Sequence, residues 1–215
     1  MKKRMLMLAL ALFMMLGVIS NTTVYAQSYE KPNLIELTDK YVVCENGEFH
    51  LVNAKQLEKR ISYDIELYRE ELNGNNIKQY LELLETRLES LNELSYNNQI
   101  MINDSGQIID LSTQTYSTRS SNMRSETYWW GRKHIFYTDA AARDYAYDVR
   151  MSAHANAGAA VIAGAVFGGV GAIPNGLTAA WAYSVADTVD YNANKPGKGV
   201  VLEARWILTY KCYPR

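Results

Sequence analysis

The amino-acid sequence predicts an α+β fold that consists of two units. In residues 40–111, two β-rich hairpin patterns enclose a pair of amphipathic helical patterns. In residues 127–213, an Ala/Gly-rich helical stretch lies between two strand patterns. Segregated runs of strands and helices are typical of the α+β class. We therefore expect an N-terminal ββααββ unit and a C-terminal βααβ unit with an apolar helical hairpin.

The first 26 residues have the pattern of a secretory signal peptide. A basic start at residues 2–4 precedes an apolar run at residues 5–19, and Val24 and Ala26 are the small residues expected before a cleavage site. The apolar run is shorter than the ~20 residues of a membrane span. We expect cleavage after Ala26 and secretion, and a permanent membrane anchor is the alternative.

Charge is distributed unevenly along the chain that follows. Residues 27–125 hold 16 acidic and 10 basic side chains, whereas residues 126–215 hold 7 acidic and 9 basic ones. This asymmetry indicates two units of different character. The small positive excess of the second unit, without a basic patch interleaved with aromatic residues, does not favour a nucleic-acid partner.

The predicted N-terminal domain, residues 27–111, begins with a polar segment up to residue 39 that we expect to be irregular. Asn46 and Gly47 then separate two β-rich runs, residues 40–45 and 48–52. Both turn residues tolerate positive φ, so the pair predicts a hairpin.

Two helical patterns and a second hairpin complete this domain. Apolar residues recur every three or four positions over residues 54–72 and 77–94, which predicts two amphipathic helices that bury their apolar faces together. We expect the charged residues between these faces, Arg87 among them, to be solvated, and the leucines to form a core rather than a cofactor site. Strand-like runs at residues 99–103 and 107–111 predict the second hairpin.

Residues 112–126 form a predicted linker. The segment is rich in Ser and Thr and poor in apolar residues, so it cannot bury enough surface to order itself. Arg119 and Arg124 make it a target for proteases. The domain before it is therefore either a removable propeptide or a permanent part of the protein.

The predicted C-terminal domain, residues 127–215, starts with a strand pattern. Aromatic and β-branched residues dominate residues 127–137, which predicts one strand that is bent at Gly131. Apolar and polar residues alternate over residues 199–213, which predicts a second, half-buried strand. The aromatic residues of the first strand suit a membrane interface, an exposed binding surface or a small core. They include Tyr128, Trp129 and Trp130.

Between these strands, residues 151–186 contain no Asp, Glu, Lys or Arg. We expect one helix from about residue 138 to 167 and a second from about residue 177 to 191, joined by a turn at Ile173-Pro174-Asn175-Gly176. Small residues recur every four positions on the first helix, which allows another helix to approach closely. The predicted membrane or helix-packing residues are Ala160, Gly164, Gly168 and Ala172, with Trp181 on the second helix.

This hairpin permits two interpretations. Residues 157–173 would extend about 25 Å as a helix, which is short of the ~30 Å hydrocarbon core of a bilayer. The hairpin therefore either inserts marginally into a membrane or packs on the C-terminal sheet. In the first case, protonation of His154 in acid is a candidate regulator of insertion.

The chain lacks the residue patterns of known catalytic and metal sites. His50, His134 and His154 lie far apart, and no HExxH, GxSxG or Walker A pattern occurs. We expect a protein that is not an enzyme and needs no cofactor or metal. Secretion permits a disulfide between the two cysteines, Cys44 and Cys212, and two unpaired thiols are the alternative.

Residues 127–215 also carry a resemblance. The Tyr128-Trp129-Trp130-Gly131 segment, the Tyr/Ala-rich helix, the glycine-rich stretch and the terminal GVVLEARWILTYK strand are similar to small secreted proteins of Gram-positive bacteria. Some of these look like large, unmodified, heat-labile bacteriocins. The resemblance implies secretion by a Gram-positive bacterium and activity against the membranes of competitors.

Two functions follow as expectations. The first is a secreted, bacteriocin-like antibacterial protein that acts on membranes through its helical hairpin. Its partners would be a bacterial membrane or cell surface, further copies of the chain, and an immunity protein. The second is a non-catalytic extracellular or cell-wall binding protein, in which the hairpin is only structural core.

Overall fold

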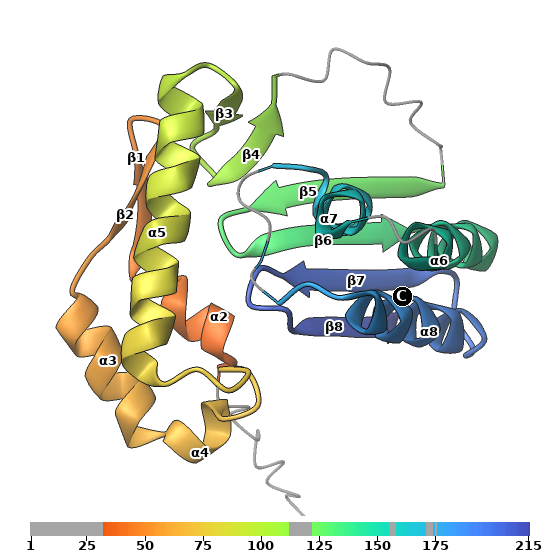
Figure 1. The fold of residues 1–215 in the computed structure, drawn as a ribbon, viewed down its shortest axis with the longest axis horizontal. Helices are drawn as coiled ribbons and strands as arrows, with labels where there is room; N and C mark the ends of the chain where they lie inside the picture. The colour runs from red at the N-terminus through yellow and green to blue at the C-terminus, as the bar shows by residue number, and fades with distance from the viewer. Residues whose placement is uncertain (1–31, 112–121, 155–157, 171–173, 175) are drawn as a thin grey trace, which may run out of the picture. The chain divides into compact units, whose positions relative to one another are not determined.

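A six-stranded antiparallel sheet forms the centre of the fold, in the order β3-β4-β5-β6-β7-β8 (Figure 1). The strands therefore follow one another in chain order, and three helices are inserted between β6 and β7. The six strands are β3 (Ile100–Ile102), β4 (Gln107–Asp110), β5 (Met123–Tyr128), β6 (Gly131–Phe136), β7 (Val200–Arg205) and β8 (Tyr210–Pro214).

The computed structural model describes residues 32–111, 122–154, 158–170, 174 and 176–215. The predicted α+β class is confirmed. Residues from Pro32 to Arg215 form one compact unit, and β4 pairs with β5 across the predicted linker. The signal peptide, its cleavage site and residues 112–121 of the linker lie outside the described residues. The division of the chain into two domains stays a prediction.

Local turn chemistry predicts both hairpins of the N-terminal half correctly. Strands β1 (Val42–Glu45) and β2 (Glu48–Leu51) pair around Asn46 and Gly47, whose φ angles of 54° and 80° are left-handed. In the β3–β4 loop, the Asn103 side-chain oxygen accepts hydrogen bonds from the backbone N–H groups of Ser105 and Gln107. The Asn103 side chain thus closes the loop, as in an Asx turn.

The helices of this half differ from the prediction in two places. Helix α5 (Ile77–Tyr96) is the expected second helix, but the first one breaks at Asp64 into α3 (Ala54–Tyr63) and α4 (Ile65–Tyr68). The polar start is not irregular, because α2 (Leu34–Thr38) forms there. Its N-terminus has a capping box, in which the side chains of Asn33 and Glu36 each accept a hydrogen bond from the other residue's backbone N–H.

The prediction of a single strand over residues 127–137 is wrong. The chain reverses at Trp129 and Trp130, and β5 pairs with β6 as a hairpin. Residues 123–126, which were assigned to the linker, belong to β5. Gly131 has a φ of 144°, and a Cβ atom there would lie 2.0 Å from the Ala204 carbonyl oxygen. Only glycine therefore permits β6 to start at this point beside β7.

The prediction of a single strand over residues 199–213 is wrong for a similar reason. Strand β7 ends at Arg205, and a turn with a left-handed residue, Leu208 (φ 61°), leads back into β8. Strand β7 lies between β6 and β8, and five of its six residues are buried. Its alternating sequence therefore does not mark a half-buried strand.

Three helices separate β6 from β7: α6 (Asp139–His154), α7 (Ala159–Phe167) and α8 (Ala179–Ala193). Figure 1 shows them over strands β5–β8, and their buried residues share one core cluster with Phe136, Val200 and Leu202. The continuous helix expected over residues 138–167 is wrong, because α6 ends at His154 and α7 is a separate helix. Helix α8 packs mainly against α6 rather than α7.

Candidate ligand-binding cleft

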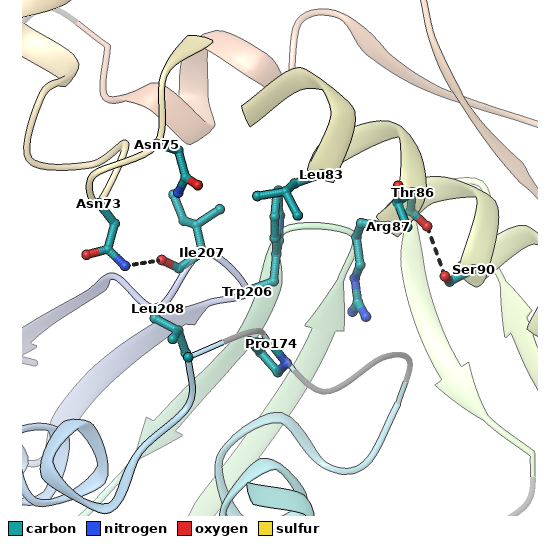
Figure 2. Close-up of a pocket in the computed structure, with 11 residues that line it drawn as sticks. Asn73, Asn75, Leu83, Thr86, Arg87, Ser90, Pro174, Trp206, Ile207 and Leu208 are labelled. Carbon is teal, nitrogen blue, oxygen red and sulfur yellow. Dashed lines mark hydrogen bonds between the residues drawn. The ribbon is translucent and has the colours of Figure 1, made fainter. Parts of the chain in front are cut away.

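A cavity of about 400 Å³ lies between α5 and the turn that follows β7 (Figure 2). The chain between α7 and α8 contributes Pro174 and Gly176 to its wall, and the loop before α5 contributes Asn73 and Asn75. We call this cavity the α5 cleft. The remaining lining residues are Leu83, Thr86, Arg87 and Ser90 of α5 and Trp206, Ile207 and Leu208 of the turn.

The residues of α5 reach the cleft because they share one face of the helix. Leu83, Thr86, Arg87 and Ser90 are spaced by three or four positions, which places them one above another. The hydroxyls of Thr86 and Ser90 each donate to a carbonyl oxygen four residues earlier, at 2.9 Å. Their protons are thus used within the helix, and only lone pairs remain for a ligand.

Arg87 is the charged residue of this lining, and it is 8% exposed. Its guanidinium donates to the carbonyl oxygens of Trp129 and Val170 at 3.4 and 3.5 Å, distances at the outer limit of a hydrogen bond. None of the ion pairs in the described residues involves Arg87. Burial lowers the pKa of Arg87 to about 10. A buried charge without a counter-charge costs several kcal/mol.

Several contacts hold the opposite wall of the cleft in place. Trp206 is 9% exposed and stacks on Tyr80 with ring centroids 6.1 Å apart. Beside it, the buried guanidinium of Arg205 forms an ion pair with Glu71. The side-chain amide of Asn73 donates to the Ile207 carbonyl oxygen at 3.0 Å (Figure 2). These contacts fix the turn against the N-terminal half of the protein.

Trp206 itself carries an unsatisfied group. Its indole Nε1–H is buried and has no hydrogen-bond partner. Buried donors are nearly always paired in folded proteins. The walls of the cleft therefore contain a cation with weak partners and a free donor.

The predicted aromatic surface is divided by the structure. Tyr128 and Trp130 are half-buried and stack with ring centroids 5.2 Å apart. Trp129, in contrast, is 3% exposed, and its Nε1–H donates to an Asp39 carboxylate oxygen at 2.8 Å. Trp129 is thus a core residue rather than a surface residue.

The structure places the members of the predicted small-residue face in different surroundings. Ala160 and Gly164 are exposed, and a Cβ atom at Gly164 would meet nothing within 4 Å. Gly168 ends α7 with a left-handed φ of 77° and packs against the Arg132 side chain. Ala172 lies outside the described residues. A packing role for this face with a membrane or a second chain stays a prediction.

Trp181, the predicted packing residue of α8, is half-buried. Its ring stacks on Phe167 with centroids 5.8 Å apart, and its Nε1–H donates to the Leu208 carbonyl oxygen at 2.7 Å. Trp181 therefore ties α8 to α7 and to the turn that forms the α5 cleft.

The predicted disulfide is absent from the structure. Cys44 and Cys212 are both free thiols, and they pack against different core clusters. Cys44 approaches the Asn103 carbonyl oxygen and Cys212 the Thr188 carbonyl oxygen, each at 3.8 Å. Burial raises the pKa of both thiols, that of Cys212 to about 11. The structure therefore has the two unpaired thiols that were the alternative to the disulfide.

One histidine finds partners across the fold. His134 Nε2–H donates to the Val166 carbonyl oxygen at 2.8 Å, so Nδ1 accepts from the Ser125 hydroxyl at 2.9 Å. Both ring nitrogens are satisfied and His134 is 1% exposed, which leaves no access for a substrate. Burial, followed by the nearby charge of Arg132, lowers the pKa of His134 to about 3. The Ser125–His134 pair thus fastens α7 to the sheet.

His154, the predicted acid-sensitive residue, is exposed at the end of α6, and its Nδ1 lies 3.3 Å from the Tyr183 hydroxyl. Across the described ranges, no three His, Cys, Asp or Glu side chains form a group that could hold a metal ion. No helix in those ranges has both the length and the apolar character to cross a bilayer.

These features define the chain as an α+β protein with an antiparallel meander sheet and a cleft that contains a buried cation. No protein-family model, curated protein or solved structure matches it.

Sequence reasoning missed both key residues of the cleft. Arg87 was expected to be solvated, although it lies three residues after Leu84 and four before Leu91, both of which are fully buried. That spacing places it on the buried face of α5, so a helical-wheel projection would have found it. Trp206 was assigned to the middle of a strand, and nothing local marks it as a turn residue.

Proposed function

We propose that the protein is a non-catalytic extracellular binding protein that takes its ligand in the α5 cleft. The observation that carries this proposal is Arg87, a buried guanidinium that lines a cavity and has no carboxylate partner in the described residues. Cavities lined mostly by apolar groups with a few directed polar groups are typical of ligand sites. The signal-peptide pattern supports the extracellular location.

The test uses a neutral fluorescent probe and a pair of blocking variants. N-phenyl-1-naphthylamine brightens in apolar sites and is titrated into the purified full chain. Thr86→Trp places an indole in the cleft, whereas Glu85→Trp adds the same side chain at an exposed position of α5 that is not part of the lining. We expect one probe to bind per wild-type chain, with at least tenfold weaker binding in Thr86→Trp only. Equal binding by both variants contradicts the proposal.

A second candidate function is bacteriocin-like action on bacterial membranes. The observation in its favour is the outward face of α7, where Ala160, Val161 and Gly164 are exposed and Val161 is 52% exposed. Exposed apolar residues of this kind suit a membrane or a second copy of the chain. An immunity protein would then be a further partner.

Dye release from anionic liposomes tests the second candidate, at neutral and at acid pH. Gly164→Leu adds bulk to the small-residue face, where the fold has space for it, and Gly158→Leu adds the same bulk just before α7. If close helix association carries the activity, only Gly164→Leu reduces leakage. Absence of leakage at micromolar wild-type protein rejects membrane action.

A further inference from the structure

We propose that the ligand of the α5 cleft is a small organic carboxylate with an apolar body, and that its carboxylate pairs with Arg87. This inference rests on the proposed function and names the class of ligand. It follows from the charge of the lining residues, from the long hydrogen bonds of the Arg87 guanidinium and from the apolar side chains on both walls.

The charge of the lining favours an anion with a single charge. Arg87 is its one basic residue, and no acidic residue is among the lining residues. A carboxylate balances one guanidinium, whereas a phosphate monoester would bring a second, uncompensated negative charge. A planar guanidinium also matches a carboxylate in a two-pronged hydrogen-bonded pair.

The position of Arg87 makes this pair strong. Its side chain extends from α5 toward Pro174, and Trp206 rises from the opposite wall toward Leu83 (Figure 2). The carbonyl oxygens that now accept from the guanidinium are 3.4 and 3.5 Å away, so shorter bonds to an ionised acceptor would replace weak ones. A carboxylate would also supply the counter-charge that this buried guanidinium lacks within the described residues.

The remaining lining selects an apolar body next to the carboxylate. Leu83, Pro174, Trp206 and Leu208 offer aliphatic and aromatic surface on both walls. The hydroxyl protons of Thr86 and Ser90 are already used within α5. A ligand with many acceptors would therefore find few further donors, whereas a hydrocarbon chain or ring would bury apolar area.

The experiment compares two probes that differ in charge. 4-Phenylbutyrate and its neutral amide, 4-phenylbutyramide, are titrated into the full chain by calorimetry, with inorganic phosphate as a third arm. Binding is also followed through the indole N–H resonances of the four tryptophans. We expect the wild-type chain to bind the carboxylate at least tenfold more tightly than the amide, and the Trp206 resonance to shift.

Two substitutions on α5 isolate the role of Arg87. Arg87→Met removes the buried cation, whereas Lys78→Met removes a cation from an exposed side chain of the same helix and changes the net charge equally. We expect Arg87→Met to abolish the preference for the carboxylate and Lys78→Met to keep it. Arg87→Lys, which retains the charge without the planar fork, should keep a reduced preference and serves as the second variant if Arg87→Met fails to fold.

The outcomes separate this inference from the proposed function. If wild-type protein binds the amide as tightly as the carboxylate, or if Arg87→Met keeps the preference, the carboxylate inference is overturned and a neutral binding site remains. Tighter binding of inorganic phosphate than of phenylbutyrate overturns it as well. If neither phenylbutyrate, its amide nor the neutral naphthylamine probe binds, the proposed function itself fails.

Discussion

Acid should destabilise the protein through His134. The folded state holds the imidazole neutral, since burial lowers its pKa from an ordinary 6.5 to about 3. The unfolded chain therefore binds a proton at a higher pH than the folded one, and protonation favours unfolding. The contribution of His134 to the free energy of unfolding is complete above about pH 6.5 and declines as the pH falls toward 3.

The magnitude follows from the width of this window. Each pH unit between the two pKa values changes the free energy of unfolding by up to about 1.4 kcal/mol. At pH 4.5 the loss from this residue alone amounts to about 3 kcal/mol by the same relation. Because Val166 of α7 accepts a hydrogen bond from the ring, the contact between α7 and the sheet is the one directly affected.

Urea unfolding of wild type and His134→Gln at pH 7.0, 5.5 and 4.5, followed by tryptophan fluorescence at fixed ionic strength, measures this effect. Glutamine keeps a donor and an acceptor but does not titrate. The carboxylates are the same in both proteins, so the difference between their pH dependences reports on His134. The wild type should lose about 3 kcal/mol more than the variant between pH 7.0 and 4.5. Equal losses in both proteins refute the reasoning.

Three further outcomes are expected. Gly199 has a φ of 91°, and a Cβ atom there would lie 1.9 Å from the Phe136 carbonyl oxygen, so Gly199→Ala should lower the free energy of unfolding by about 3 kcal/mol or more in urea titrations. Gly158→Ala, whose Cβ would meet nothing within 4 Å, should not change it measurably. Glu71→Gln should cost about 3 kcal/mol in the same assay because it leaves Arg205 buried without its partner, whereas Glu66→Gln breaks an exposed pair and should have little effect. Both thiols should take up iodoacetamide in the unfolded, unreduced chain, and a mass that shows no alkylation would contradict the free state of the cysteines.

The sequence allowed good predictions wherever structure depends on neighbouring residues. Asn46 and Gly47 carry their turn conformation in their own backbone preferences, and the apolar period of α5 is visible without any knowledge of its partners. Asn33 and Glu36 have the spacing of a capping box, but the five-residue helix α2 that follows is too short to show an apolar period. Short-range signals thus sufficed to predict the β1–β2 turn and α5, but not α2.

The predictions of single strands over residues 127–137 and 199–213 failed for the same physical reason. Their turns contain Trp129 and Trp130 in one case and the apolar run from Trp206 to Leu208 in the other, all residues that favour strands. Trp129 and Trp206 are buried in the same core cluster, and this burial offsets their poor turn propensity. Such a gain depends on packing between distant segments, which local patterns do not contain. The α5 cleft was missed with them, because one of these turns forms its wall.

The central position of β7 has a consequence for the order of events during synthesis. Strand β6 and the buried faces of α6 and α8 are covered only when residues 200–205 have left the ribosome. Long-range pairing of this kind also has to overcome the entropy of a long closed loop. A chain that has been synthesised only as far as residue 199 therefore lacks the strand that completes this core, and α6 and α8 pack on a finished sheet only after β7 has been added.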